Sequence, residues 1–115
     1  MTTIFERTET ALGTISPAVP FSSAPYKGTL PNAYITHQLI NSSPEQHADN
    51  EETERSYTMQ LTLWDKTNIP SATQVDSAMK AAGFEKGDVR QLPQDAQTHH
   101  YGLAVEYVYF ETKEL

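Results

Sequence analysis

The stretch of sequence that most constrains the fold is residues 54–66, ERSYTMQLTLWDK. Its apolar and polar side chains alternate, and in a β-strand successive side chains point to opposite faces. A helix would scatter the same apolar residues around its circumference. The pattern therefore predicts a strand with one buried face. The apolar face would hold Tyr57, Met59, Leu61 and Leu63, and the other face Thr58, Gln60, Thr62 and Trp64.

A short helix is expected near the N-terminus, over residues 3–12. Thr3 and Glu6 have the spacing of a capping box, in which a hydroxyl and a carboxylate satisfy free amides of the first turn. Gly13 follows at the position of a C-cap. The buried stripe of this helix is expected to consist of Ile4, Phe5, Thr8, Ala11 and Leu12.

A second helix is expected to begin at residues 69–71. Gly83 stands at the position after its C-cap, and Phe84 can fold back on the apolar stripe, which is the pattern of a Schellman motif. The stripe itself has the spacing of one helix face and consists of Val75, Ala78, Met79 and Ala82.

Three further segments are rich in β-branched and aromatic residues or stand between turn signals, and they predict strands at residues 33–40, 87–92 and 99–112. Two other segments predict connections. Residues 16–32 contain four prolines, which allow at most a short edge strand near Val19 and Phe21. Residues 41–53, NSSPEQHADNEET, are polar, and we expect a long exposed connection there.

This order of elements predicts an α+β fold in a single domain of residues 1–115. The strands occur in adjacent pairs, and two helices are too few for regular crossovers between parallel strands. We therefore expect a mainly antiparallel sheet with both helices packed on one face, and long loops in the N-terminal half.

Composition argues against several classes of protein. The chain has no cysteine, so it can form neither a disulfide framework nor a thiolate metal site. Its formal charge of −7 argues against a protein that binds nucleic acid or an anionic membrane. No apolar run approaches the roughly 18 residues that span a bilayer, and the N-terminus lacks the pattern of a signal peptide. We expect a soluble, cytoplasmic protein.

No group of residues has the pattern of a reaction centre. Imidazole and carboxylate groups bind zinc and related metals, but the spacings of known metal motifs are missing. Nucleophile motifs, phosphate-binding glycine loops and calcium loops are missing too. We expect no catalytic residue, cofactor or metal, and exposed histidines without a ligand. The strongest metal candidates are His37, His47, Asp49, His99 and His100.

Five short motifs occur in a set order along the chain. They are LPNAYI at residues 30–35, SPEQHADN at 43–50, YTMQLTLWDK at 57–66, MKAAGF at 79–84 and HY at 100–101, before the last predicted strand. In this order and spacing they resemble the tail completion, or tail-to-head joining (tail terminator), proteins of long-tailed double-stranded DNA phages. The N-terminal third departs from that family, which usually has a longer first helix and a more compact link.

The resemblance implies a structural protein of the virion and not an enzyme. Proteins of this kind form a ring, often a hexamer, at the head-proximal end of the finished tail tube. The ring ends tube growth and docks the head connector, and DNA passes through its lumen without specific binding. The implied partners are further copies of the chain, the tail tube protein and the head completion protein. The implied location is the tail of the virion, and the host cytoplasm during assembly.

Two other classes stay open. One is a small metal-dependent hydrolase built on His47, Asp49 and a third histidine, and the other is a small bacterial binding domain of similar fold. For a structural protein, we expect the interface at the ends of the 54–66 strand and in the proline-rich segment. The candidate interface residues are Glu45, His47, Asp49, Glu51, Glu52, Trp64, Tyr26 and Lys27.

Overall fold

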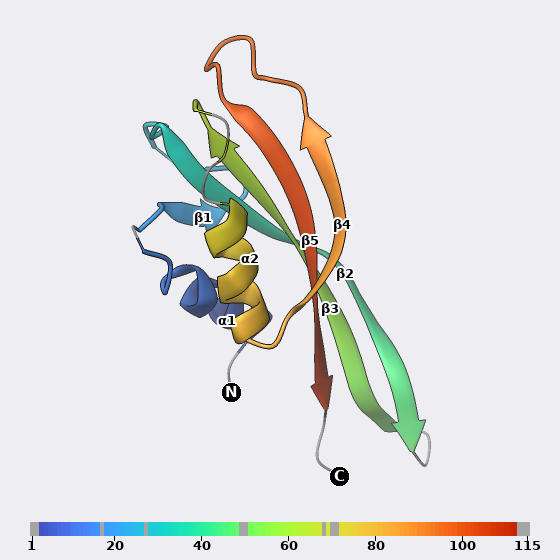
Figure 1. The fold of residues 1–115 in the computed structure, drawn as a ribbon. Coiled ribbons are helices and arrows are strands. Elements are labelled where there is room, and N and C mark those ends of the chain that lie inside the picture. The colour runs from blue at the N-terminus through green and yellow to red at the C-terminus, as the bar shows by residue number, and fades with distance from the viewer. Residues whose placement is uncertain are drawn as a thin grey trace.

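The computed structural model describes residues 3–16, 18–26, 28–48, 51–67, 69 and 72–112, with the backbone alone for residues 45–48 and 51–53. Within these residues, a five-stranded sheet has two helices on one face (Figure 1), so the fold is α+β as predicted. In chain order the elements are α1 (Ile4–Leu12), β1 (Phe21–Ser23), β2 (Ala33–Ala48), β3 (Glu51–Asp65), α2 (Ala72–Ala81), β4 (Glu85–Leu92) and β5 (Tyr101–Thr112).

The sheet has the strand order β1-β2-β3-β5-β4 and is antiparallel except at β1, which runs parallel to β2. β2 and β3 form one long hairpin, and β5 pairs with β3 along its whole length. These ladders satisfy the backbone polar groups of the central strand β3 on both sides. They also make an elongated molecule that measures 53 × 25 × 24 Å.

The core lies between the helices and one face of the sheet. Met59, Leu61 and Leu63 of β3 are at most 1% exposed, which confirms the face predicted from the alternation in residues 54–66. Ile35 of β2 and Val105 of β5 pair with this face and are buried with it. Burial of apolar surface here is the main stabilising contribution to the fold. The helices add Ile4, Ala11, Leu12, Val75 and Met79 to the same cluster.

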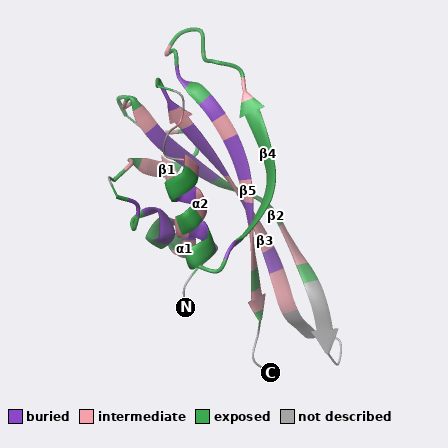
Figure 2. Cartoon of the chain, in the orientation of Figure 1, coloured by how far each residue is buried: buried purple, intermediate pink, exposed green. Residues whose placement is uncertain are grey.

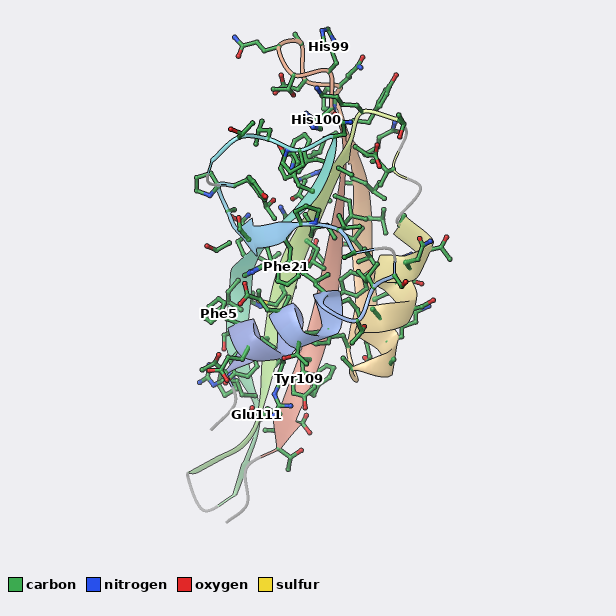
Figure 3. The ribbon with its side chains drawn as sticks, turned by 90° about the vertical axis from the view of Figure 1, so that its left-hand side faces the viewer. Phe5, Phe21, His99, His100, Tyr109 and Glu111 are labelled. Atoms are coloured by element: carbon green, nitrogen blue, oxygen red, sulfur yellow. The ribbon has the colours of Figure 1, made fainter. Side chains whose placement is uncertain are left out.

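Thr3 caps α1 as predicted, which is the half of the capping box that the hydrogen bonds of the described residues bear out. Thr3 Oγ1 accepts a hydrogen bond from the Glu6 N–H at 3.1 Å, and Gly13 closes the helix through its N–H to Glu9 O. Four of the five stripe residues are buried, but the prediction was wrong for Phe5, which is 46% exposed (Figure 3). Phe5 lies at the border of the buried arc, about 100° around the helix from Ile4.

α2 ends in the predicted Schellman motif. Gly83 has a φ of +95°, and its N–H donates to Lys80 O. The Phe84 N–H donates to Met79 O, and the Phe84 ring is buried against the core. Glycine suits this position because a left-handed φ strains residues that have a Cβ atom.

The prediction of a long connection at residues 41–53 was wrong. β2 continues to Ala48 and β3 starts at Glu51, so this segment belongs to the hairpin apart from residues 49 and 50, which lie outside the described residues. The hairpin projects past the helices (Figure 1). The segment is polar in sequence, so the period-two signal of a half-buried strand is missing. We call residues 41–54 the arm.

The proline-rich segment is partly ordered by the sheet. Its short edge strand is β1, at Phe21–Ser23, close to the predicted place. Backbone hydrogen bonds join this segment to β2 on both sides of β1, from Ile35 N–H to Pro20 O and from Ala24 N–H to His37 O. No helix in the described part of the chain is long and apolar enough to span a membrane.

One polar cluster joins α2 to the edge of the sheet. Asp76 on α2 contacts Lys80 at 3.0 Å and Lys86 at 3.6 Å, and the Tyr107 hydroxyl donates to its Oδ1 at 3.2 Å. The hydrogen bond from Lys80 and the two positive charges hold the pKa of Asp76 below its ordinary value. Burial, together with the Asp76 carboxylate, raises the pKa of Tyr107 far above its ordinary value.

We expect Asp76→Asn to lower the free energy of unfolding at pH 7 by about 0.5–1 kcal/mol, because both lysines lose their partner. The folded pKa of Asp76 lies below the unfolded one, so its contribution is complete above the unfolded pKa of about 4. That contribution is lost as the pH falls through the folded pKa. Urea unfolding at pH 7 and at about pH 2 measures the difference between variant and wild type, which should vanish in acid.

Asp88→Asn is the matched control, since Asp88 is an exposed carboxylate on β4 without an ion pair among the described residues. It should leave stability unchanged at both pH values. An equal loss for Asp76→Asn at both pH values would contradict the charge contribution.

Candidate interaction surfaces

The face of the sheet opposite the helices holds an aromatic hollow. The loop after β1 overhangs the ends of β2 and β3 there and encloses a space of about 450 Å³. Two of the predicted interface residues, Tyr26 and Trp64, meet in it although they are far apart in the sequence. The described residues that line the hollow are all uncharged: Ala24, Pro25, Tyr26, Leu30, Tyr34, Thr36, Gln38, Gln60, Thr62 and Trp64.

Tyr34 is the centre of this aromatic cluster. Its ring stacks on Trp64 at a centroid distance of 6.1 Å, tilts against Tyr26 at 4.9 Å and meets the His100 ring edge-on at 5.1 Å. Burial raises the pKa of Tyr34, and the negative charge of Asp95 adds to the shift. Three rings around one buried tyrosine make a stiff patch of large apolar area.

Gly102 allows Trp64 to lie flat against the sheet. It pairs with Trp64 across β3 and β5, and a Cβ atom at Gly102 would stand 2.8 Å from Trp64 Cζ3 and 3.1 Å from Leu92 Cδ1. An isolated glycine within a strand pattern is a known signal of such a close approach. Gly102 therefore carries a signal in the sequence for the position of Trp64, whereas Tyr34 has no such local signal.

Two histidines are buried, which corrects the prediction that the histidines are exposed. His100 is 1% exposed, and its Nε2 donates to Pro31 O at 2.8 Å, which ties the proline-rich segment to β5. His37 is 3% exposed on the helix-covered face, where its Nε2 lies 3.0 Å from Glu9 Oε2. His99 is exposed, as expected. The residues that bury the two histidines come from distant elements, so no local sequence pattern predicts their burial.

The remaining predicted interface residues do not join the hollow. The backbone of Glu45, His47, Glu51 and Glu52 lies near the tip of the arm, at the end of the β2–β3 hairpin that is remote from Trp64. Asp49 and Lys27 lie outside the described residues. The candidate set is therefore split between the two ends of the molecule.

No cluster of three or more metal-ligating side chains occurs among the residues that were searched, which are the described ones. His37 and His100 are on opposite faces of the sheet, since His37 contacts α1 and His100 contacts Tyr34 in the aromatic cluster. The pairing of His47 with Asp49 lies outside the side chains that the structure describes.

Both edges of the sheet are open over part of their length. β4 is exposed along nearly all its residues (Figure 2) and pairs with β5 on one side only. On the other side, β1 pairs with residues 35–37 of β2, and the described backbone of β2 beyond His37 has no further strand beside it. Each open edge carries a large exposed apolar side chain, Val89 on β4 and Leu39 on β2.

Comparisons with known proteins do not assign the chain to a family. No protein-family model matches the sequence, and no match was found among the curated proteins.

We expect Gly102→Ala to destabilise the protein by about 1–3 kcal/mol, because the added methyl group displaces the Trp64 ring from the sheet. Trp64 is the only tryptophan of the chain, so its fluorescence reports the displacement directly. Urea unfolding followed by this fluorescence measures both effects.

Gly13→Ala is the matched control, because Gly13 has a φ of −68° and a Cβ atom there meets only ordinary contacts. It should change stability by less than about 0.5 kcal/mol and leave the fluorescence of the folded protein unchanged. Equal effects of the two substitutions would show that the hollow does not depend on Gly102.

Proposed function

We propose that this protein is a tail completion protein of a long-tailed phage, the subunit of a ring that closes the head-proximal end of the tail tube. The observation that carries the proposal is the incomplete sheet. One face lacks a covering layer among the described elements, and two dissimilar edges are open on opposite sides of the subunit. A sheet of this kind is completed when neighbouring subunits assemble around it.

A closed ring needs a heterologous interface, in which one patch of each subunit meets a different patch of the next. Two unlike open edges on one subunit meet this requirement. A two-fold dimer, in contrast, needs one patch that is complementary to itself. The geometry of the subunit therefore favours a ring over a dimer.

The two ends of the subunit differ in chemistry, which suits a protein with two different axial partners. The aromatic hollow lies at one end of the β2–β3 hairpin, and the arm lies at the other end. In the sequence, the arm holds Glu45, Glu51, Glu52 and Glu54. One end would contact the tail tube protein and the other the head completion protein.

The charge of the chain suits a channel through which DNA passes. On the face opposite the helices, Gln38 and Gln60 are accessible neutral side chains, whereas Thr36 and Thr62 are buried. Beside Gln60, the acidic residues Asp88 and Glu106 and the basic Arg90 line a second hollow. The formal charge of the whole chain is −7. A net negative charge repels phosphates, so DNA can slide past such a subunit without binding.

Deletion of the gene from a phage that carries it tests the proposal. We expect tails of uncontrolled length that do not join heads, since nothing ends tube growth or docks the connector. Electron microscopy of the lysate measures tail length and head attachment, and the wild-type gene supplied from a plasmid should restore both. Particles with joined tails of normal length would overturn the proposal.

A further inference from the structure

We propose that β4 of one copy pairs antiparallel with the open edge of β2, residues 39–44, in the next copy, so that the sheets join into one continuous sheet. This inference deepens the proposed ring and rests on it for the expectation that the chain of subunits closes. It identifies the two contacting edges, their direction and their offset.

The outer edge of β4 is open, and its regular part begins at Val89, after a register shift against β5 between Lys86 and Val89. All residues from Glu85 to Gln91 are exposed, and β4 pairs with β5 alone among the described strands. An edge strand of this length presents a row of free N–H and C=O groups that can accept another strand. A partner strand would satisfy these groups by backbone hydrogen bonds.

The directions of the two edges fit a rotation between copies. β2 is antiparallel to β3, β3 to β5, and β5 to β4, so β2 and β4 run in opposite directions within one sheet. When a second copy is placed beside the first without inversion, its β2 runs antiparallel to the first copy's β4. Each copy can therefore use both edges in the same way, which is the heterologous contact of a cyclic oligomer.

The backbone groups of the two edges also have matching orientation. Ile35 and His37 of β2 turn their N–H and C=O groups toward β1. In an antiparallel sheet, the backbone N–H and C=O groups of successive residues point alternately to the two neighbouring strands. Following the register from β2 to β4, the backbone groups of Leu39, Val89 and Gln91 point away from the sheet of their own subunit. The register of β2 shifts between Leu39 and Asn41, so Ser42 is the next residue of β2 that faces outward. Hydrogen bonds between copies can therefore form between Leu39 and Gln91 and between Ser42 and Val89 without breaking those within a copy.

The side chains at the two edges match as well. Val89 is level with Val105, and Leu39 pairs with Met59, so both point to the helix-covered face. Val89 is 48% exposed and Leu39 is 37% exposed in the single chain. Pairing of the edges would bring these two side chains onto one face and remove apolar surface from water.

β1 determines the offset between copies. Gln91 is level with Ile35 across its own sheet, but in the next copy β1 covers β2 at Ile35 and His37. Gln91 must therefore lie opposite Leu39 or a later residue of the next copy. This shifts neighbouring copies by about four residues along the strands, and a sheet that closes into a barrel requires such a stagger. Pro44 lacks an N–H group and marks the far end of the pairing segment.

One basic residue, Arg90, suits a second copy of this chain as the partner of β4. The strand is neutral overall, with Lys86 and Arg90 against Glu85 and Asp88. Lys86 already contacts Asp76, but Arg90 has no ion pair among the described residues. The offset brings β4 toward the arm of the next copy, whose sequence holds Glu45, Glu51 and Glu52. Opposite charges near the contact favour this arrangement.

Cysteine crosslinking of the purified protein tests the pairing, because the chain has no cysteine of its own. The double variant Leu39→Cys/Gln91→Cys carries one thiol on each edge. With a short bis-maleimide reagent we expect a ladder of covalent oligomers that ends at the size of the ring. A mixture of the two single variants should give dimers only, and each single variant alone should stay monomeric.

Thr10→Cys/Thr73→Cys is the control double variant, since both positions are exposed on the helices and lie on neither edge. It should give no ladder. The inference is overturned if the edge variant gives no more oligomer than this control, or if a single variant crosslinks with itself, since that requires a two-fold contact.

A second pair of variants tests the backbone hydrogen bonds. The Val89 N–H faces away from β5, so Val89→Pro removes a donor of the outer edge and no bond of the subunit's own sheet. Val89→Thr keeps both the N–H and the β-branched shape. We expect Val89→Pro to reduce the oligomer to monomer in light scattering with an unchanged circular dichroism spectrum, and Val89→Thr to keep the oligomer.

An oligomer that survives Val89→Pro in a folded protein would overturn the edge pairing. The crosslinking outcome is separate from the outcome of the gene deletion. A defect in tail length without a ladder would refute this inference alone, whereas a ladder without any tail defect would refute the proposed function alone.

Discussion

The structure depends on the burial of one face of β3. Met59, Leu61 and Leu63 are covered by both helices, and the strands on either side place their own apolar residues on the same face. Because β3 is the central strand, its apolar face determines on which side of the sheet α1 and α2 pack. The opposite face is then free of a covering layer, and it holds the hollow and the polar residues between the two edges.

The bare face is stabilised locally by aromatic contacts and not by a second layer. Tyr34 packs against Trp64, Tyr26 and His100, and the His100 ring holds Pro31 through a hydrogen bond. The proline-rich segment is thus attached to the sheet, although it has little regular structure. The same segment supplies β1, which covers part of one sheet edge and leaves the rest open.

The strand structure of the arm and the burial of His37 and His100 are not predicted by local sequence patterns. In residues 41–53 the polar composition favoured a connection, because the alternating apolar pattern of a half-buried strand is missing there, although the described backbone pairs as a hairpin. His37 and His100 were expected to be exposed, and each is buried by contacts with residues at least 28 positions away in the sequence. In contrast, Thr3 and Gly83 act as predicted, because caps depend on a few neighbouring residues.

Local patterns are enough to predict the fold class, the Thr3 cap of α1, the Gly83 end of α2 and the buried face of β3, because each depends on periodicity or on contacts within one turn. The meeting of Tyr26 and Trp64 in one hollow, with the acidic candidates at the other end, follows only from the tertiary fold. The same is true of which strand edges remain open. Strand order and edge exposure depend on pairings between distant segments, and the spacing of residues within a single strand does not encode them.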